Sequence, residues 1–167
     1  MRINKEQRVG VFVDVQNLYY SAKNLYKAKV NFAAVLREAV KGRKLVRAIA
    51  YVIKANIKEE KNFHDALENI GYEVRMKDLQ TFAGGAKKGD WDIGIAMDMI
   101  ELANKLDTMI LVSGDGDFVD LLQHLKRAMG CRVEVIAIGP SSSGKLRSEA
   151  DDFMDIDKSK SKFLIKY

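Results

Sequence analysis

The sequence predicts an α/β fold in which helices cover both faces of a mostly parallel central sheet, a three-layer α/β/α arrangement. Two observations carry this prediction. Short apolar runs alternate along the 167 residues with segments of helical periodicity. The first run, RVGVFVDV at 8–15, is apolar at almost every position, which is typical of a parallel strand buried on both faces.

The first half of the chain supplies three of the expected strands and three of the expected helices. Asn31 is a suitable N-cap for the second helix, and Gly42 and Gly71 are placed to end the second and third. The expected strands are 8–15, 44–54 and 72–79, and the expected helices are 17–28, 31–42 and 59–71.

The second half continues the alternation. A helix at 91–106 leads to the apolar strand 107–113, and a helix at 118–130 leads to the strand 131–139. A Ser/Gly loop, a short helix at 145–152 and an edge strand at 153–157 complete the pattern. Right-handed crossovers place the loops that follow parallel strands along one edge of the sheet, which is where ligands of such sheets bind.

The chain is expected to form one domain over residues 1–167, with a core at about 8–156 and a basic tail at 157–167 that is solvated or disordered. Pro140 is its sole proline, and neither a long linker nor a repeat divides it. Cys131 is the sole cysteine, which excludes an internal disulfide and fits an inert, buried thiol in a reducing compartment. We therefore expect a cytoplasmic protein without a membrane span.

Charge gives a weak indication of partners. The formal net charge is +5, which mildly favours polyanionic partners such as nucleic acid. The histidines, His64 and His124, are far apart in the sequence and fit helix surfaces, so a zinc site of histidine and cysteine is excluded.

Acidic residues follow the two most apolar strands. Asp14 ends the first strand, and Asp115 and Asp117 come directly after the strand 107–113. If these strands are central neighbours, the three carboxylates share one region at the carboxyl edge of the sheet. Each has a structural alternative, since Asp14 fits a strand-end cap and the Asp115–Asp117 pair fits an Asx turn with an N-cap.

The helix at 91–106 contributes a fourth acid. On a wheel of about 100° per residue, Asp92 lies on the same side as Ala96, Met99 and Ala103, whereas Asp98 falls on a polar side that we expect to face solvent. An acid on an apolar helix face is anomalous. Because Asp92 lies in the first turn, it can emerge beside the other acids, where the helix dipole favours its charge.

Four carboxylates in one pocket repel one another unless cations neutralise them. A donor set made only of carboxylate oxygens suits Mg²⁺ or Mn²⁺. We therefore expect Asp14, Asp92, Asp115 and Asp117 to bind a divalent cation.

Three stretches carry a family resemblance: VFVDVQNL at 11–18, KKGDWDIGIAMDMI at 87–100 and LVSGDGDFVDLL at 111–122. In order and separation they resemble the motifs of the LabA-like NYN family of the PIN-like nuclease superfamily. The resemblance covers about residues 8–156. It implies a Rossmann-like α/β/α fold and a divalent-metal site that cleaves RNA.

The resemblance also implies roles for individual residues. Asp14 matches the acid of the first strand, Asn17 the polar residue at the following helix start, Asp92 the acid that opens the central helix, and Asp115 and Asp117 the later pair. For the phosphodiester hydrolysis that the family implies, we expect Asp14 and Asp115 to be direct metal ligands, with Asp92 and Asp117 completing the site. Asp98 also recurs in LabA-like sequences and is held in reserve.

The remaining substrate-binding candidates come from their chemistry. Ser113 neighbours the acidic turn, and Lys87, Lys88, Lys145 and Arg147 lie in basic loops suited to phosphate, although Lys87 and Lys88 equally fit a solvated loop.

Three other functions require residues that this chain lacks. GPSSSGKL at 139–146 nearly matches a nucleotide-binding P-loop, but Leu146 stands where a metal-binding hydroxyl is required. DVQNL at 14–18 lacks the second acid of haloacid-dehalogenase phosphatases, and no glycine-rich dinucleotide fingerprint follows the first strand. The serious alternative to a nuclease is a catalytically silent module of the same fold that binds RNA or a protein.

Overall fold

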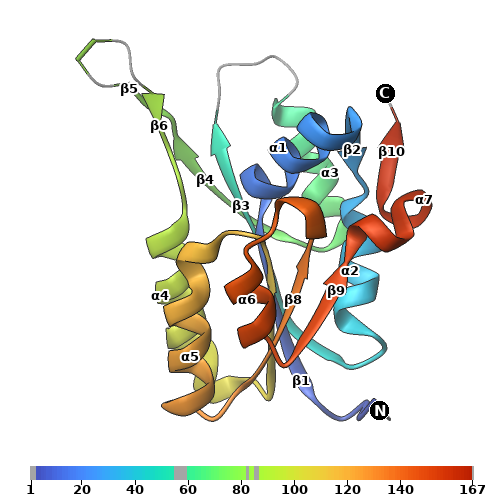
Figure 1. The fold of residues 1–167 in the computed structure, drawn as a ribbon, viewed down its shortest axis with the longest axis vertical. Helices are drawn as coiled ribbons and strands as arrows, with labels where there is room; N and C mark the ends of the chain where they lie inside the picture. The colour runs from blue at the N-terminus through green and yellow to red at the C-terminus, as the bar shows by residue number, and fades with distance from the viewer. Residues whose placement is uncertain (1–2, 55–59, 82, 85–86, 167) are drawn as a thin grey trace.

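In the computed structural model, which describes residues 3–54, 60–81, 83–84 and 87–166, six parallel strands form the central sheet (Figure 1). Their order across the sheet is β4-β3-β1-β7-β8-β9, and every neighbouring pair is parallel. The strands are β1 (Arg8–Asp14), β3 (Lys44–Lys54), β4 (Glu73–Asp78), β7 (Thr108–Val112), β8 (Arg132–Ala137) and β9 (Asp152–Asp155).

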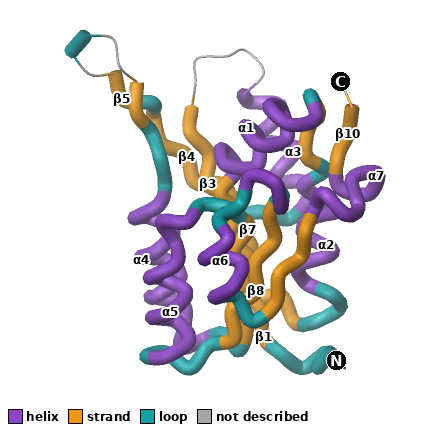
Figure 2. The backbone as a smooth tube through the Cα atoms, viewed as in Figure 1, coloured by secondary structure: helices purple, strands orange, loops and turns teal. Residues whose placement is uncertain are grey.

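Helices cover both faces of the sheet, as predicted (Figure 2). One face carries α1 (Val15–Tyr26), α2 (Phe32–Val40), α3 (Glu60–Ile70) and α7 (Lys160–Phe163). The other carries α4 (Asp92–Leu102), α5 (Val119–Arg127) and α6 (Gly144–Glu149). Four 3₁₀ turns connect these elements: η1 (Ala103–Lys105), η2 (Gly116–Phe118), η3 (Gly139–Ser141) and η4 (Ile156–Ser159).

The side chains of β1 show why the sheet has two cores. Val11 and Val13 point into the core beneath α1 and α2, whereas Phe12 points into the core beneath α4 and α5. Successive strand residues face opposite sides, so a strand buried on both faces must be apolar at nearly every position. This confirms the interpretation of RVGVFVDV.

The strand order places the functional edge. From β1 the chain winds outward to β3 and β4, and it then returns to the other side of β1 as β7, β8 and β9. β1 and β7 are therefore central neighbours, as predicted, and the topological switch point lies between their carboxyl ends. Asp14 and the Asp115–Asp117 turn follow these two ends.

The amino edge of the sheet holds a buried ion pair that the sequence did not reveal. The guanidinium of Arg43 donates to both carboxylate oxygens of Glu134 at 3.0 and 2.9 Å, and also to the carbonyl oxygens of Ala39 and Val40. Arg132 donates to the same carboxylate at 3.0 Å. This bidentate geometry satisfies the buried charges.

The described part of the tail at 157–167 is ordered rather than disordered, although most of its residues are exposed to solvent. The segment forms η4, α7 and β10 (Leu164–Lys166), and β10 pairs antiparallel with β2 (Ala28–Val30). The Phe163 side chain is buried in the core between these elements. The lysine-rich composition of the segment did not indicate that one aromatic side chain, Phe163, would anchor it to the core.

A short hairpin also lies in the predicted basic loop. β5 (Gln80–Thr81) pairs antiparallel with β6 (Lys87–Lys88), so the backbone around Lys87 and Lys88 is extended rather than irregular. The other predicted elements are confirmed, with ends displaced by a few residues. Asn31 caps α2 by accepting the Ala34 N–H, but Lys41 rather than Gly42 is the left-handed C-cap.

Candidate metal centre

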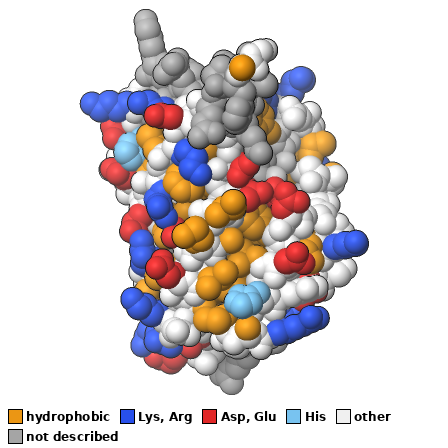
Figure 3. Space-filling view, turned by 90° about the vertical axis from the view of Figure 1, so that its left-hand side faces the viewer, with side chains coloured by type: hydrophobic (Ala, Val, Ile, Leu, Met, Phe, Trp, Pro, Cys, Tyr) orange, Lys and Arg blue, Asp and Glu red, His pale blue; other side chains and the backbone are white. Residues whose placement is uncertain are grey.

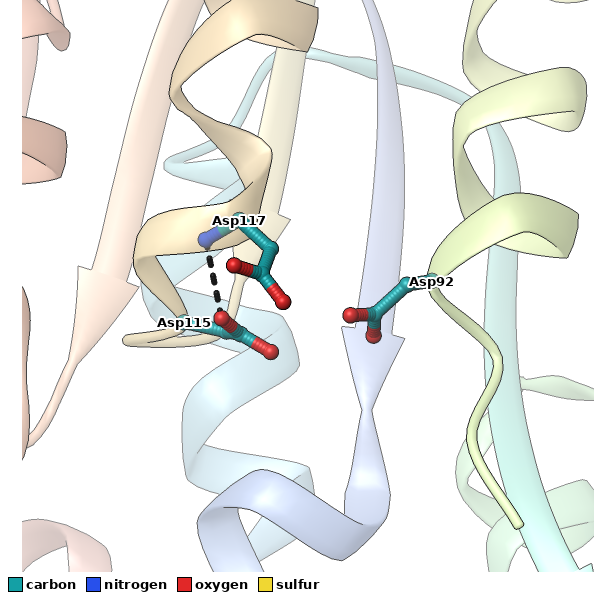
Figure 4. Close-up of side chains that lie close together, drawn as sticks. All are labelled: Asp92, Asp115 and Asp117. Atoms are coloured by element: carbon teal, nitrogen blue, oxygen red, sulfur yellow. Dashed lines mark hydrogen bonds between the residues drawn. The ribbon is translucent and has the colours of Figure 1, made fainter.

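Three carboxylates meet at the switch point (Figure 4). One oxygen from each of Asp92, Asp115 and Asp117 lies within 4.8 Å of the others. Asp115 and Asp117 come from the segment after β7, Asp92 comes from the start of α4, and the end of β1 lies between them in this view. The structure thus brings together three of the four acids expected to bind metal.

The acids stand at the starts of helical segments because each strand of a parallel sheet is followed by a crossover that begins at this edge. Asp115 caps η2 by accepting the Asp117 N–H at 2.9 Å, and Asp92 is the first residue of α4. The cap predicted as the structural alternative for Asp115 is therefore present. The capping hydrogen bond uses the Oδ1 atom of Asp115. The positive end of the helix dipole, at the helix start, also stabilises negatively charged carboxylates.

Asp14 lies next to this trio and is held in place from two sides. It caps α1, where its Oδ1 accepts the Asn17 N–H at 3.4 Å, and its Oδ2 accepts the Ser113 hydroxyl at 3.1 Å. The residue is only 8% exposed. The alternative reading of Asp14 as a cap is thus also present, and the carboxylate is a fixed, nearly buried group beside the other acids.

Asn17 and Ser113 connect the two central strands. The Asn17 Oδ1 accepts the Gly114 N–H at 2.9 Å, and the Ser113 Oγ accepts the Asp115 N–H at 3.2 Å. These contacts fix the turn that carries Asp115 against the start of α1. Both residues were expected to bind substrate, and the structure shows them first as groups that orient the acids.

The acids perturb one another. Burial, followed by the charges of Asp115, Asp14 and Asp90, raises the pKa of Asp92 to about 7. Burial also raises the pKa of Asp14 to about 6, although the hydrogen bonds from Ser113 and Asn17 oppose the shift. Burial is the main cause of both shifts, and the neighbouring carboxylates add to it.

Asp90 is a fifth acid that sequence reasoning missed. Its Oδ1 accepts the Asp92 N–H at 3.2 Å, and its charge raises the pKa of both Asp14 and Asp92. It stands in the same KKGDWD stretch as Asp92, two residues earlier. The wheel could not place Asp90 because it precedes the helix.

The glycines of the SGDGD turn are explained by close packing against the serine loop at 139–143. A Cβ on Gly114 would meet the Cα of Ser142 at 3.0 Å, and one on Gly116 would meet the Ser143 Oγ at 2.9 Å. The Ser143 N–H donates to the Gly114 carbonyl oxygen at 3.0 Å. The loop that resembles a P-loop therefore braces the acidic turn.

The prediction that Asp98 faces solvent is wrong. Its carboxylate accepts the Tyr51 hydroxyl at 2.7 Å and pairs with the Arg75 guanidinium, and its side chain is 17% exposed. Its partners come from β3 and β4, and it is not among the acids that converge in the trio. Tyr51 and Arg75 reach Asp98 from other elements of the fold, and a helical wheel of α4 alone cannot show such partners.

The outward side of α4 is apolar instead (Figure 3). Ile93, Met97 and Ile100 are 76%, 63% and 39% exposed. The buried side carries Ile95 and Met99, and Asp92 adjoins it, as the wheel indicated.

The basic candidates stand apart from these contacts. Lys145 is exposed in the first turn of α6, and the Arg147 guanidinium lies over the Phe153 ring at 4.5 Å from its centroid. The side chains of Lys87 and Lys88 lie outside the described part of the structure.

Of the histidines, His124 is exposed on α5, and His64 pairs with Glu68 on α3. Cys131 is free and buried, as predicted.

The donor set fits a hard divalent cation. All donors are carboxylate oxygens, three of them converge, and the neighbouring hydrogen bonds hold the acidic turn and Asp14 in place. The raised pKa values of Asp14 and Asp92 add an electrostatic reason for a cation there. Mg²⁺ and Mn²⁺ match this chemistry.

Comparison with known proteins identifies the family. The NYN domain model matches residues 8–157, which span the whole sheet and the acid cluster. The chain belongs to the NYN domain family. NYN domains are PIN-like, so membership agrees with the three-layer fold and points to the PIN-like nucleases.

Two relatives extend this assignment. This NYN domain is 28% identical over 163 residues to the Low amplitude and bright protein LabA of Synechococcus elongatus, covering 91% of this chain and 85% of that protein. It also resembles a crystal structure of VPA0982 from Vibrio parahaemolyticus, a protein of unknown function, with a TM-score of 0.88 and 34% identity. That match covers 99% of this chain and all of the other.

Within the described residues, no helix combines the length and apolar character needed to cross a membrane.

Proposed function

We propose that this NYN domain is a divalent-metal-dependent nuclease that hydrolyses phosphodiester bonds of RNA in the cytoplasm. The observation that carries the proposal is the convergence of Asp92, Asp115 and Asp117 within 4.8 Å at the switch point of a PIN-like fold. The NYN family match and the net charge of +5 add support.

In this proposal Asp92, Asp115 and Asp117 hold Mg²⁺ or Mn²⁺, with Asp14 beside them. A bound cation supplies positive charge that neutralises the scissile phosphate and acidifies water. Asp14, held beside the trio by its hydrogen bonds from Asn17 and Ser113, would complete the site as a further carboxylate ligand. Asn17 offers its amide nitrogen to the substrate, because its oxygen already accepts the Gly114 N–H.

Lys145 is exposed and follows the serine loop in the sequence, so it is a candidate contact for phosphate. Lys87, Lys88 and Arg147 are further candidates for the same role.

A cleavage assay tests the proposal. Purified protein should cleave a mixed-sequence RNA with Mn²⁺ or Mg²⁺, and EDTA or Asp115→Asn should reduce cleavage to background. Asp120→Asn is the matched control, because Asp120 is an exposed acid in the first turn of α5, outside the trio. Cleavage that persists in the Asp115→Asn protein would exclude this site.

The alternative is a catalytically silent module that binds RNA or a protein. It is favoured by the capping roles of Asp14 and Asp115, which give these acids a structural use without metal. The two functions separate in one experiment. A silent module binds RNA equally with wild-type and Asp115→Asn protein and shows no cleavage with either metal.

A further inference from the structure

A cavity of about 380 Å³ extends from the acids along one side of α1. Asn17, Tyr20, Ser21 and Asn24 line it from the helix, and Ser141 lines it from η3. The spacing of three and four residues places the α1 side chains on one helix face. We call this cavity the α1 groove. It begins at Asp14, Asp92 and Asp115, so a substrate at the acids continues into it.

The groove is chemically different from its acidic end. The other lining side chains are amides, hydroxyls, one aromatic ring and the apolar Leu25, and the described residues that line the cavity include no lysine or arginine. Such a surface does not attract phosphate, which requires cationic or backbone N–H donors. Neutral amides and hydroxyls instead suit the edges of a nucleobase, which offer both donors and acceptors.

Tyr20 gives the groove a stacking surface. Its side chain is 50% exposed although it borders the cavity. The Tyr19 ring lies nearly perpendicular to it, with the centroids 5.3 Å apart, and restricts its position. An exposed tyrosine held beside a neutral, hydrogen-bonding wall is the arrangement that stacks single-stranded bases.

We propose that the α1 groove binds an unpaired nucleobase of a single-stranded nucleic acid, with Tyr20 stacking on its face and Ser21 and Asn24 bonding its edge. The proposal deepens the proposed nuclease function and rests on it for the scissile phosphate at the acids. A base inside a duplex has both faces covered, so this site selects single strands or extruded bases.

The test measures binding separately from cleavage. Fluorescein-labelled eight-nucleotide RNA and DNA strands, and their duplexes, are titrated by anisotropy against Asp115→Asn protein, in which turnover is blocked. The single strand should bind more tightly than the duplex. Tyr20→Leu should weaken single-strand binding by about 5- to 100-fold, the range for loss of one base–aromatic stack. Tyr20→Phe keeps the ring and should stay within about twofold.

A set of strands that each lack one base isolates the stacking contact. One abasic position should weaken binding as Tyr20→Leu does, and combining the two should cost no more than either alone. Met97→Ala is the control, since Met97 is exposed on α4, away from the groove. Binding of either RNA or DNA strands supports the proposal, and a preference for RNA adds a contact to the 2′-hydroxyl.

The outcomes distinguish this proposal from the nuclease. Any one of three results would overturn the assignment of the α1 groove as a base-binding site. These are equal binding of duplex and single strand, no binding of any strand, and an equal loss of affinity for intact and abasic strands in Tyr20→Leu. If the wild-type protein cleaves RNA but Tyr20→Leu leaves binding unchanged, the groove assignment fails and the nuclease stands. If binding depends on Tyr20 but neither metal supports cleavage, the nuclease fails and the groove stands.

Discussion

At the amino edge of the sheet, the buried carboxylate of Glu134 meets Arg43 and Arg132, whereas at the carboxyl edge Asp14 and Asp92 face further carboxylates. Burial alone would raise the pKa of Glu134, but its hydrogen bonds from the arginines hold it below the usual value. The pKa values of Asp14 and Asp92 are raised. At the amino edge of the sheet, opposite charges are paired, and we call it the paired edge. At the carboxyl edge, carboxylates of like charge lie close together, and we call it the collected edge.

The comparison separates structural charge from functional charge. A paired buried charge is satisfied within the fold, so nothing further has to bind. Collected carboxylates destabilise the metal-free fold, and a ligand that neutralises them recovers that free energy on binding. The predictions below test this distinction.

The largest effect should come from breaking the paired edge. Arg43→Met leaves Glu134 buried without its main partner and should lower the free energy of unfolding by about 3–5 kcal/mol. The double variant Arg43→Met/Glu134→Met removes both charges and should recover most of this loss. Denaturant titrations measure both. A double variant as unstable as the single one would show that the arginine stabilises through its contacts with Ala39 and Val40 instead.

Metal should act only at the collected edge. Adding Mg²⁺ or Mn²⁺ at 100 times its dissociation constant should stabilise the wild-type fold by about 2.7 kcal/mol through mass action. Asp92→Asn and Asp117→Asn should weaken this gain, whereas the Arg43→Met/Glu134→Met protein should keep it. Melting curves with and without metal give the comparison. A gain that survives both aspartate changes would place the cation elsewhere.

The two edges should also respond to pH in opposite directions. Between about pH 4 and 7, folded metal-free protein binds more protons than the unfolded chain, because the pKa values of Asp14 and Asp92 rise to about 6 and 7. Stability should therefore fall as pH rises through this window, by about 3 kcal/mol for Asp14, and the full penalty applies above pH 7.

Glu134 supplies the contrast. Because its pKa is lowered, its contribution is present above the unfolded value of about 4.5 and is lost as the pH falls below it. Unfolding free energies from pH 3 to 8 for wild-type and Asp14→Asn protein measure both trends. Asp14→Asn should flatten the decline above pH 4 and leave the acid limb unchanged, and an unchanged decline would contradict the assigned cause.

The sequence predicted the sheet and most of the acid cluster because both depend on local patterns. Apolar runs identified β1 and β7, and residues directly after parallel strands must share one edge. Phe163 and Asp98 were misjudged because their surroundings are tertiary. A single buried ring anchors the lysine-rich tail, and Tyr51 and Arg75, distant in sequence, receive the Asp98 carboxylate. The partners of Arg43 and the packing of the serine loop were hidden for the same reason.

Asp98 provides the smallest and most discriminating test, because it is a carboxylate of α4 that belongs to neither kind of edge. Its partner Arg75 is 46% exposed, so solvent screens the pair, and an asparagine still accepts the Tyr51 hydroxyl. Asp98→Asn should therefore cost about 0.5–1 kcal/mol and leave the metal-induced gain in melting temperature unchanged. Asp92→Asn, six residues earlier on the same helix, should do the reverse by easing repulsion without metal and losing the gain. If Asp98→Asn lost the metal response while Asp92→Asn kept it, Asp98 would be the ligand and the Asp92–Asp115–Asp117 trio would be acids at helix starts that bind no metal.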